Sequence, residues 1–80
     1  MLELINQFNS TENRQIIKQN LKRIMKEKRI KKDRIISLGY SFHNVSSWLN
    51  KANNNAPNVE QSLHIATTFD FDVRELLKIS

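Results

Sequence analysis

The spacing of apolar residues between positions 12 and 28 constrains the fold of this chain more than any other feature. Large apolar side chains recur there at steps of three and four residues: Ile16, Ile17, Leu21, Ile24 and Met25. That spacing places them on one face of an α-helix. The opposite face is basic and carries Lys18, Lys22, Lys26 and Arg29. We therefore predict a long basic helix at about 12–28, followed by Ile30 as a buried plug in a short connection.

Two shorter helices follow by the same reasoning. Ile35 and Leu38 lie three residues apart and predict a helix at about 32–38. Gly39 comes next, at a position where a helix end often needs a positive φ. Another helix is predicted at about 42–50, and its inward face comprises Val45, Trp48 and Leu49.

The outward face of the 42–50 helix is polar and almost uncharged. Its members are Phe42, His43, Asn44, Ser46, Ser47 and Asn50. A face that is merely solvated usually carries lysine and glutamate, whereas small hydroxyl and amide side chains can read hydrogen-bond patterns on a partner. Ser41 stands just before this helix and is a suitable N-cap. The 42–50 helix is therefore the candidate binding element.

Capping signals predict two more helices near the C-terminus. Asn58 with Gln61 three residues later is a capping-box pattern, and Asp72 with Glu75 repeats it. With the three helices above, these two complete a set of five.

Composition favours a purely helical fold. One glycine and one proline in 80 residues argue against a β-rich fold, which needs turn residues about every 8–12 positions. We predict a single all-α domain at 11–80, with residues 1–10 as an N-terminal arm or a short extra turn. Because cysteine is absent, disulfides and Cys-ligated zinc are excluded. No apolar run approaches the ~18 residues of a membrane span, so we expect a cytoplasmic protein with no membrane partner.

Positive charge is concentrated in one part of the chain. The net charge is +5, and nine of the thirteen basic residues fall between positions 18 and 34, opposed only by Glu27 and Asp33. A basic half beside a mildly acidic half is typical of a polyanion binder. A solvated helix face has the same composition, so charge alone leaves both interpretations open.

An ordered set of residues carries a family resemblance. The segment Leu38-Gly39-Tyr40-Ser41, the apolar Val45, Pro57 and the stretch 63–76 occur in the order found in the phage-repressor and Cro (XRE-type) helix-turn-helix family, which this chain resembles. In that family they correspond to the turn, the anchor of the recognition helix, a proline before the fourth helix, and the last two helices. The chain departs from the pattern at positions that usually hold a capping Ser or Thr, Gly and Glu, which here are Lys31, Arg29 and Leu49.

The resemblance implies a compact five-helix, lambda-repressor-like DNA-binding domain with its helix-turn-helix at about 32–50. In such a motif the second helix enters the major groove and the first crosses the DNA backbone. The implied base-reading residues are Phe42, His43, Asn44, Ser46 and Ser47. The implied phosphate-binding residues are Lys31, Lys32, Ser41, Asn50, Lys51 and Asn53.

The resulting hypothesis is a sequence-specific, double-stranded DNA-binding transcriptional regulator. The resemblance further implies a repressor from a phage or another mobile element. Since one recognition helix covers only a few base pairs, we expect a homodimer on an inverted-repeat operator. Leu76, Leu77 and Ile79 are the candidate interface, and residues 1–9 are the alternative.

Two other interpretations remain open. The chain can be a protein-interaction module, such as an antitoxin or an antirepressor partner, or the DNA-binding part of a longer ligand-sensing regulator. An enzyme is not expected, because no Ser/His/Asp set stands at catalytic spacing and a small bundle leaves little room for a substrate pocket. His43 and His64 lack a cysteine or a nearby carboxylate cluster, so neither a metal nor another cofactor is expected.

Overall fold

The computed structural model describes residues 2–79 of the chain. The regular secondary structure in that range consists of helices joined by loops, without a strand. The all-α prediction is confirmed. Five α-helices and a final 3₁₀-helix, η1, follow one another: α1 Leu2–Asn9, α2 Thr11–Lys28, α3 Lys32–Ile36, α4 Phe42–Trp48, α5 Val59–Thr68 and η1 Val73–Leu77. Across the same residues, none of the helices combines the length and the apolar character needed to cross a bilayer.

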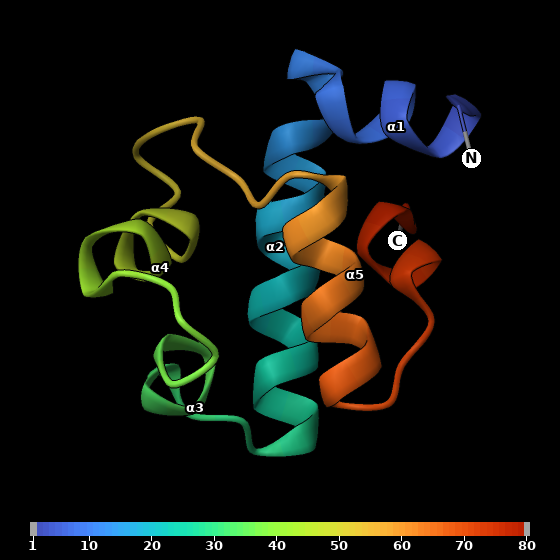
Figure 1. The fold of residues 1–80 in the computed structure, drawn as a ribbon. Coiled ribbons are helices and arrows are strands. Elements are labelled where there is room, and N and C mark those ends of the chain that lie inside the picture. Colours follow the sequence, from blue (N-terminus) through green and yellow to red (C-terminus); the bar gives the residue numbers. More distant parts are fainter. Residues whose placement is uncertain (1, 80) are drawn as a thin grey trace.

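The long helix α2 runs through the middle of the molecule (Figure 1). In that view α3 and α4 lie on one side of α2, and η1 lies on the other. α3 packs on α4, while η1 packs on α2 and α5. Every helix contributes to one core, whose fully buried large side chains include Ile17, Leu21, Ile35, Val45, Trp48, Ile65 and Leu76. Burying a side chain of this size stabilises the fold by about 1.5–3 kcal/mol.

The N-terminal segment is a helix rather than an arm. α1 spans eight residues, Leu2–Asn9, and packs against α2 and α5. Phe8 is only 2% exposed and Leu4 packs against the same cluster. The sequence predicted an arm or a short extra turn for residues 1–10, and the structure has a packed helix of eight residues there; Met1 lies outside the described residues.

The connection from α2 to α3 is made by a residue in the left-handed conformation. Arg29 has φ 57° and ψ 42°, and the next backbone N–H, that of Ile30, donates to the carbonyl of Met25 at 2.8 Å. This hydrogen bond ends α2 with a left-handed residue, a position that glycine usually occupies. Ile30 is buried, as the sequence predicts.

Replacing Arg29 with glycine is expected to raise the free energy of unfolding by about 0.5–1 kcal/mol. The left-handed conformation costs an L-residue about 1–2 kcal/mol, and the greater chain entropy of glycine offsets about half of that gain. Urea unfolding measures the difference. Lys28→Gly is the matched control, because Lys28 is the last residue of α2 and glycine in a helix lowers stability. Equal effects of the two changes would contradict this explanation.

The shorter helices end earlier than their apolar spacing predicts. α3 stops at Ile36 rather than 38, and α4 stops at Trp48 rather than 50. Gly39 has φ 110°, and a Cβ built there would meet nothing within 4 Å. Backbone conformation, and not lack of space, therefore selects glycine at this turn.

The caps of the C-terminal helices agree in part with the sequence. Asn58 and Gln61 form the predicted capping box, with side chain to backbone distances of 2.8 and 2.9 Å. Asp72 accepts from the backbone N–H of Arg74 at 2.9 Å, so the expected box with Glu75 is replaced by a single cap. The reason is that η1 is a 3₁₀-helix, whose tighter turns place other N–H groups within reach.

Candidate nucleic-acid interface

α4 is held to the core by its inward face. Val45 is fully buried and Trp48 is 1% exposed. The Trp48 ring meets the ring of Tyr40 edge to face, with centroids 5.3 Å apart. The hydroxyl of Tyr40 in turn lies 2.8 Å from Nδ1 of His64 on α5, and burial, with the negative charge of Glu60, raises the pKa of Tyr40. Trp48 therefore belongs to the core and is no exposed stacking platform.

The outward face of α4 presents its first turn to solvent. Phe42, His43 and Asn44 are exposed, whereas Ser46 and Ser47 are half-buried. The hydroxyl oxygen of Ser41 accepts from the backbone N–H of Asn44 at 3.0 Å. Ser41 is thus the N-cap that the sequence predicts, which leaves its hydroxyl hydrogen for a partner.

A lysine from α3 joins two predicted base-reading residues of α4. Lys32 Nζ donates to Ser46 Oγ at 3.1 Å. The same ammonium lies 4.7 Å from the centroid of the Phe42 ring, which is a cation–π distance. The start of α3 and the outward face of α4 therefore form one surface. Lys31, which precedes Lys32, is also exposed.

A shallow hollow lies along the outward face of α4 and the residues that follow it. It is lined by His43, Ser46, Ser47, Asn50 and Asn53. The structure thus brings together five of the eleven residues predicted to contact DNA. Lys51, which follows Asn50, is exposed.

Lys18 does not lie on the solvated basic face where the sequence placed it. Its side chain is 3% exposed, and its ammonium donates to the carbonyl of Ser47 at 2.7 Å, the carbonyl of Asn55 at 2.8 Å and Oδ1 of Asn53 at 2.9 Å. A weak signal exists in the sequence, because Lys18 lies at the edge of the apolar stripe between Ile17 and Leu21. Nothing in the sequence predicts that oxygens of the loop after α4 accept hydrogen bonds from Lys18.

Two of the predicted DNA-contacting residues take part in the Lys18 network. Ser47 Oγ donates to Asn53 Oδ1 at 3.3 Å and accepts from Asn55 Nδ2 at 3.0 Å. Gln15 Nε2 donates to the Asn53 carbonyl at 2.7 Å. The hydroxyl of Ser47 is therefore occupied within the protein, so we no longer expect it to be a principal base-reading group.

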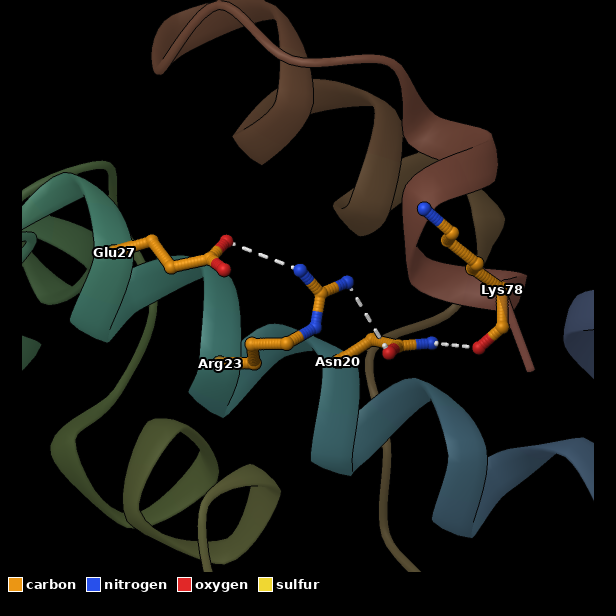
Figure 2. Close-up of polar contacts among 4 residues, drawn as sticks. All are labelled: Asn20, Arg23, Glu27 and Lys78. Atoms are coloured by element: carbon orange, nitrogen blue, oxygen red, sulfur yellow. Dashed lines mark hydrogen bonds and ion pairs between the residues drawn. The ribbon is translucent and has the colours of Figure 1, made fainter. Parts of the chain in front are cut away.

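The remaining basic residues divide into exposed and paired groups. Arg23 is paired: it bonds Glu27 at 3.0 Å and the side-chain oxygen of Asn20 at 3.3 Å, while the Asn20 amide donates to the Lys78 carbonyl at 2.8 Å (Figure 2). The exposed residues follow the second half of α2 into α3: Lys22, Lys26, Lys28, Arg29, Lys31 and Arg34. Two of them also have contacts, since Lys28 Nζ donates to the Asp70 carbonyl at 3.4 Å and the Arg34 guanidinium lies 5.1 Å from the centroid of the Phe69 ring. Exposed positive charge therefore gathers next to α3 and not on α4 itself.

Comparison of the chain with protein-family models, with curated proteins and with solved structures gave no match. Within residues 2–79, no three His, Cys, Asp or Glu side chains gather closely enough to hold a metal ion. What this surface can do must therefore be inferred from its own residues, which are exposed amide, imidazole and aromatic groups flanked by lysines.

Proposed function

We propose that this protein is a sequence-specific, double-stranded DNA-binding transcriptional regulator, and that α4 reads bases in the major groove. The observation that carries the proposal is the division of α4 into two faces. Val45 and Trp48 are buried, while the exposed first turn carries Phe42, His43 and Asn44 without a single charged side chain. A rigidly held helix with such a face suits the major groove, which is about 12 Å wide.

The neighbouring elements support a helix-turn-helix at about 32–50. α3 and α4 pack directly on each other, and the chain turns between them at Gly39, with φ 110°. In this arrangement α3 crosses the DNA backbone and α4 lies in the groove. The likeness of this ordered set to phage repressors and Cro favours a repressor from a phage or another mobile element.

The exposed side chains of α4 match different base edges. An asparagine such as Asn44 pairs with N6 and N7 of adenine, and the ring of Phe42 packs on a thymine methyl group. His43 can donate or accept. Lys31, Lys32 and Lys51 would contact phosphates, fix the register and make the affinity salt-dependent.

Replacing Asn44 or His43 with alanine is expected to cost about 1–3 kcal/mol of binding free energy at one base position and to relax the preference there. Selection of bound duplexes from a random pool, before and after each change, measures this preference. Gln19→Ala is the matched control, because Gln19 is an exposed amide on α2. If both α4 variants stay folded and keep the original base preference, α4 is not the reading helix, and the protein-interaction alternative becomes the better explanation.

We further propose a homodimer on an inverted-repeat operator, with half-sites about 34 Å apart. The predicted interface needs one correction, because Leu76 is fully buried in the core and cannot face a partner. The exposed apolar residues nearby are Leu2, 72% exposed, and Ile79, 80% exposed. Between α1 and η1, a hollow is lined by Glu3, Leu4, Gln7, Arg74 and Leu77. Glu3 and Arg74 carry opposite charges on this surface, which suits pairing with a second copy related by a two-fold axis.

A further inference from the structure

Hydrogen bonds within the protein orient two asparagine amides at the end of α4. Asn53 Oδ1 accepts from Lys18 Nζ at 2.9 Å, from Ser47 Oγ at 3.3 Å and from the backbone N–H of Asn55 at 2.8 Å. Ammonium and peptide N–H groups can only donate, so the oxygen of Asn53 must be the inward atom. Its Nδ2 is then the atom left to face the hollow that Asn53 lines.

Asn50 has the same arrangement. Its Oδ1 accepts from the backbone N–H of Ala52 at 2.9 Å, and its side chain lines the same hollow as Asn53. Within the part of the chain that the structure describes, neither Asn50 Nδ2 nor Asn53 Nδ2 has a hydrogen-bond partner. Two N–H₂ groups are therefore available at this hollow, and Lys51 follows Asn50 in the sequence.

The buried charge of Lys18 lies behind this hollow. Its ammonium bonds the carbonyl of Ser47, in the last turn of α4, and the carbonyl of Asn55. A helix C-terminus carries partial negative charge that disfavours anions, and a cation placed there offsets it. Burial lowers the pKa of Lys18, but its three acceptors require three N–H donors and a neutral amine has only two. The network therefore holds the ammonium form.

That ammonium is not neutralised by a carboxylate. Among residues 2–79 the ion pair is Arg23 with Glu27, which leaves the positive charge of Lys18 balanced only by carbonyl and amide dipoles. A desolvated charge costs several kcal/mol unless it is fully hydrogen-bonded, and an apolar side chain would avoid that cost. The hydrogen-bond acceptors around position 18, and not its burial, therefore explain why the residue there is a lysine.

We propose that Lys18, which is too buried to touch DNA, is the positioning residue of a phosphate-binding site at the end of α4. The site binds one phosphodiester of duplex DNA: Asn50 and Asn53 donate through Nδ2, Lys51 supplies an exposed charge, and Lys18 fixes the Asn53 amide and offsets the helix dipole. This inference rests on the proposed function, because it assigns the phosphate to the DNA backbone.

The first test is Asn53→Asp, with a 20-base-pair duplex of arbitrary sequence as the probe. The carboxylate keeps an oxygen toward Lys18 and forms an ion pair with it, so thermal stability should be unchanged or higher. It also removes the two N–H donors of Asn53 Nδ2 and places negative charge at the phosphate, so affinity should fall about tenfold or more. Asn54→Asp is the matched control, because it makes the same charge change one residue away, where the amide oxygen accepts from Gln15; we expect about a twofold loss or less.

The second test separates positioning from direct contact through the salt dependence of binding. Lys18→Met should lower affinity about three- to tenfold, the usual loss for one hydrogen bond, without changing the slope of log affinity against log salt. Lys51→Ala should reduce that slope by about one, because it removes a cation that displaces counterions. Lys22→Met, an exposed lysine one turn along α2, controls for the lost charge.

The outcomes distinguish this inference from the proposed function. If the unaltered protein binds neither this duplex at low salt nor any duplex from the random pool, the proposed function is wrong. If it binds and Asn53→Asp matches Asn54→Asp, the phosphate site is wrong while DNA binding stands. A slope reduced by about one in Lys18→Met would show that Lys18 contacts phosphate itself, which overturns its positioning role. Should Lys18→Met fail to fold, Lys18→Arg takes its place, because the arginine keeps the charge but not the ammonium that holds Asn53 Oδ1; affinity equal to that of the unaltered protein would then overturn the positioning role.

Discussion

Replacing Trp48 with alanine is expected to lower the free energy of unfolding by about 3–5 kcal/mol. Trp48 is 1% exposed, and its ring packs edge to face against Tyr40, so truncation leaves a large cavity between α4 and the core. A domain of 80 residues has a total stability of only about 4–12 kcal/mol. The expected loss is therefore at least about a quarter of the total stability, and at the lower end of that range the variant would be unfolded at 37 °C.

Urea unfolding followed by far-ultraviolet circular dichroism measures this loss. Phe42→Ala is the matched control, since Phe42 is an aromatic residue of the same helix that is 65% exposed. Its removal gives up the contact with Lys32, which is worth about 0.5–1 kcal/mol at an exposed site. A Trp48→Ala protein as stable as Phe42→Ala would mean that Trp48 is not part of the core.

Leu76→Ala should have an effect of similar size, about 2–5 kcal/mol of unfolding free energy. Leu76 is fully buried on η1, which packs against α2 and α5. Its carbonyl also accepts from Asn20 Nδ2 at 2.8 Å, so the cavity would loosen the contact between η1 and α2. Urea unfolding at several protein concentrations measures the loss, which should persist at concentrations where the protein is monomeric.

Ile79→Ser provides the contrast on the same segment. Ile79 is 80% exposed, so its replacement should change the stability of the monomer by no more than about 0.5 kcal/mol. If the surface between α1 and η1 joins two copies, the same change should weaken self-association on operator DNA, as measured by analytical ultracentrifugation. A dimer of unchanged strength in Ile79→Ser would place the interface elsewhere.

Local sequence signals were sufficient for the framework of the fold. The apolar steps that include Leu21 and Ile24 predicted α2 to within a residue or two, and both residues are buried. The turn at Gly39 and the capping box of Asn58 with Gln61 were also predicted correctly. Each of these features depends on residues a few positions apart, so the local sequence is enough to predict it.

Features that depend on distant residues were not predictable. Lys18 is spaced like a solvated lysine. The acceptors that bind its buried ammonium lie on Ser47, Asn53 and Asn55, which come 29, 35 and 37 positions later in the chain. Phe8 lies in a segment with no capping signal, and its burial depends on the surface that α2 and α5 present to α1. The face of α4 was identified from its composition, but the use of Ser47 within the protein was not.

The chain has one tryptophan, and it lies at the last position of α4. Its indole is shielded from water and 5.3 Å from the only tyrosine ring, so the emission maximum of the native protein should be blue-shifted and partly excited through that tyrosine. The blue shift would be lost if α4 separated from the core while α2 and α5 stayed helical. Fluorescence therefore reports the docking of this one helix, while circular dichroism reports the whole bundle. A difference between the two unfolding curves would reveal an intermediate in which the proposed reading helix is already detached.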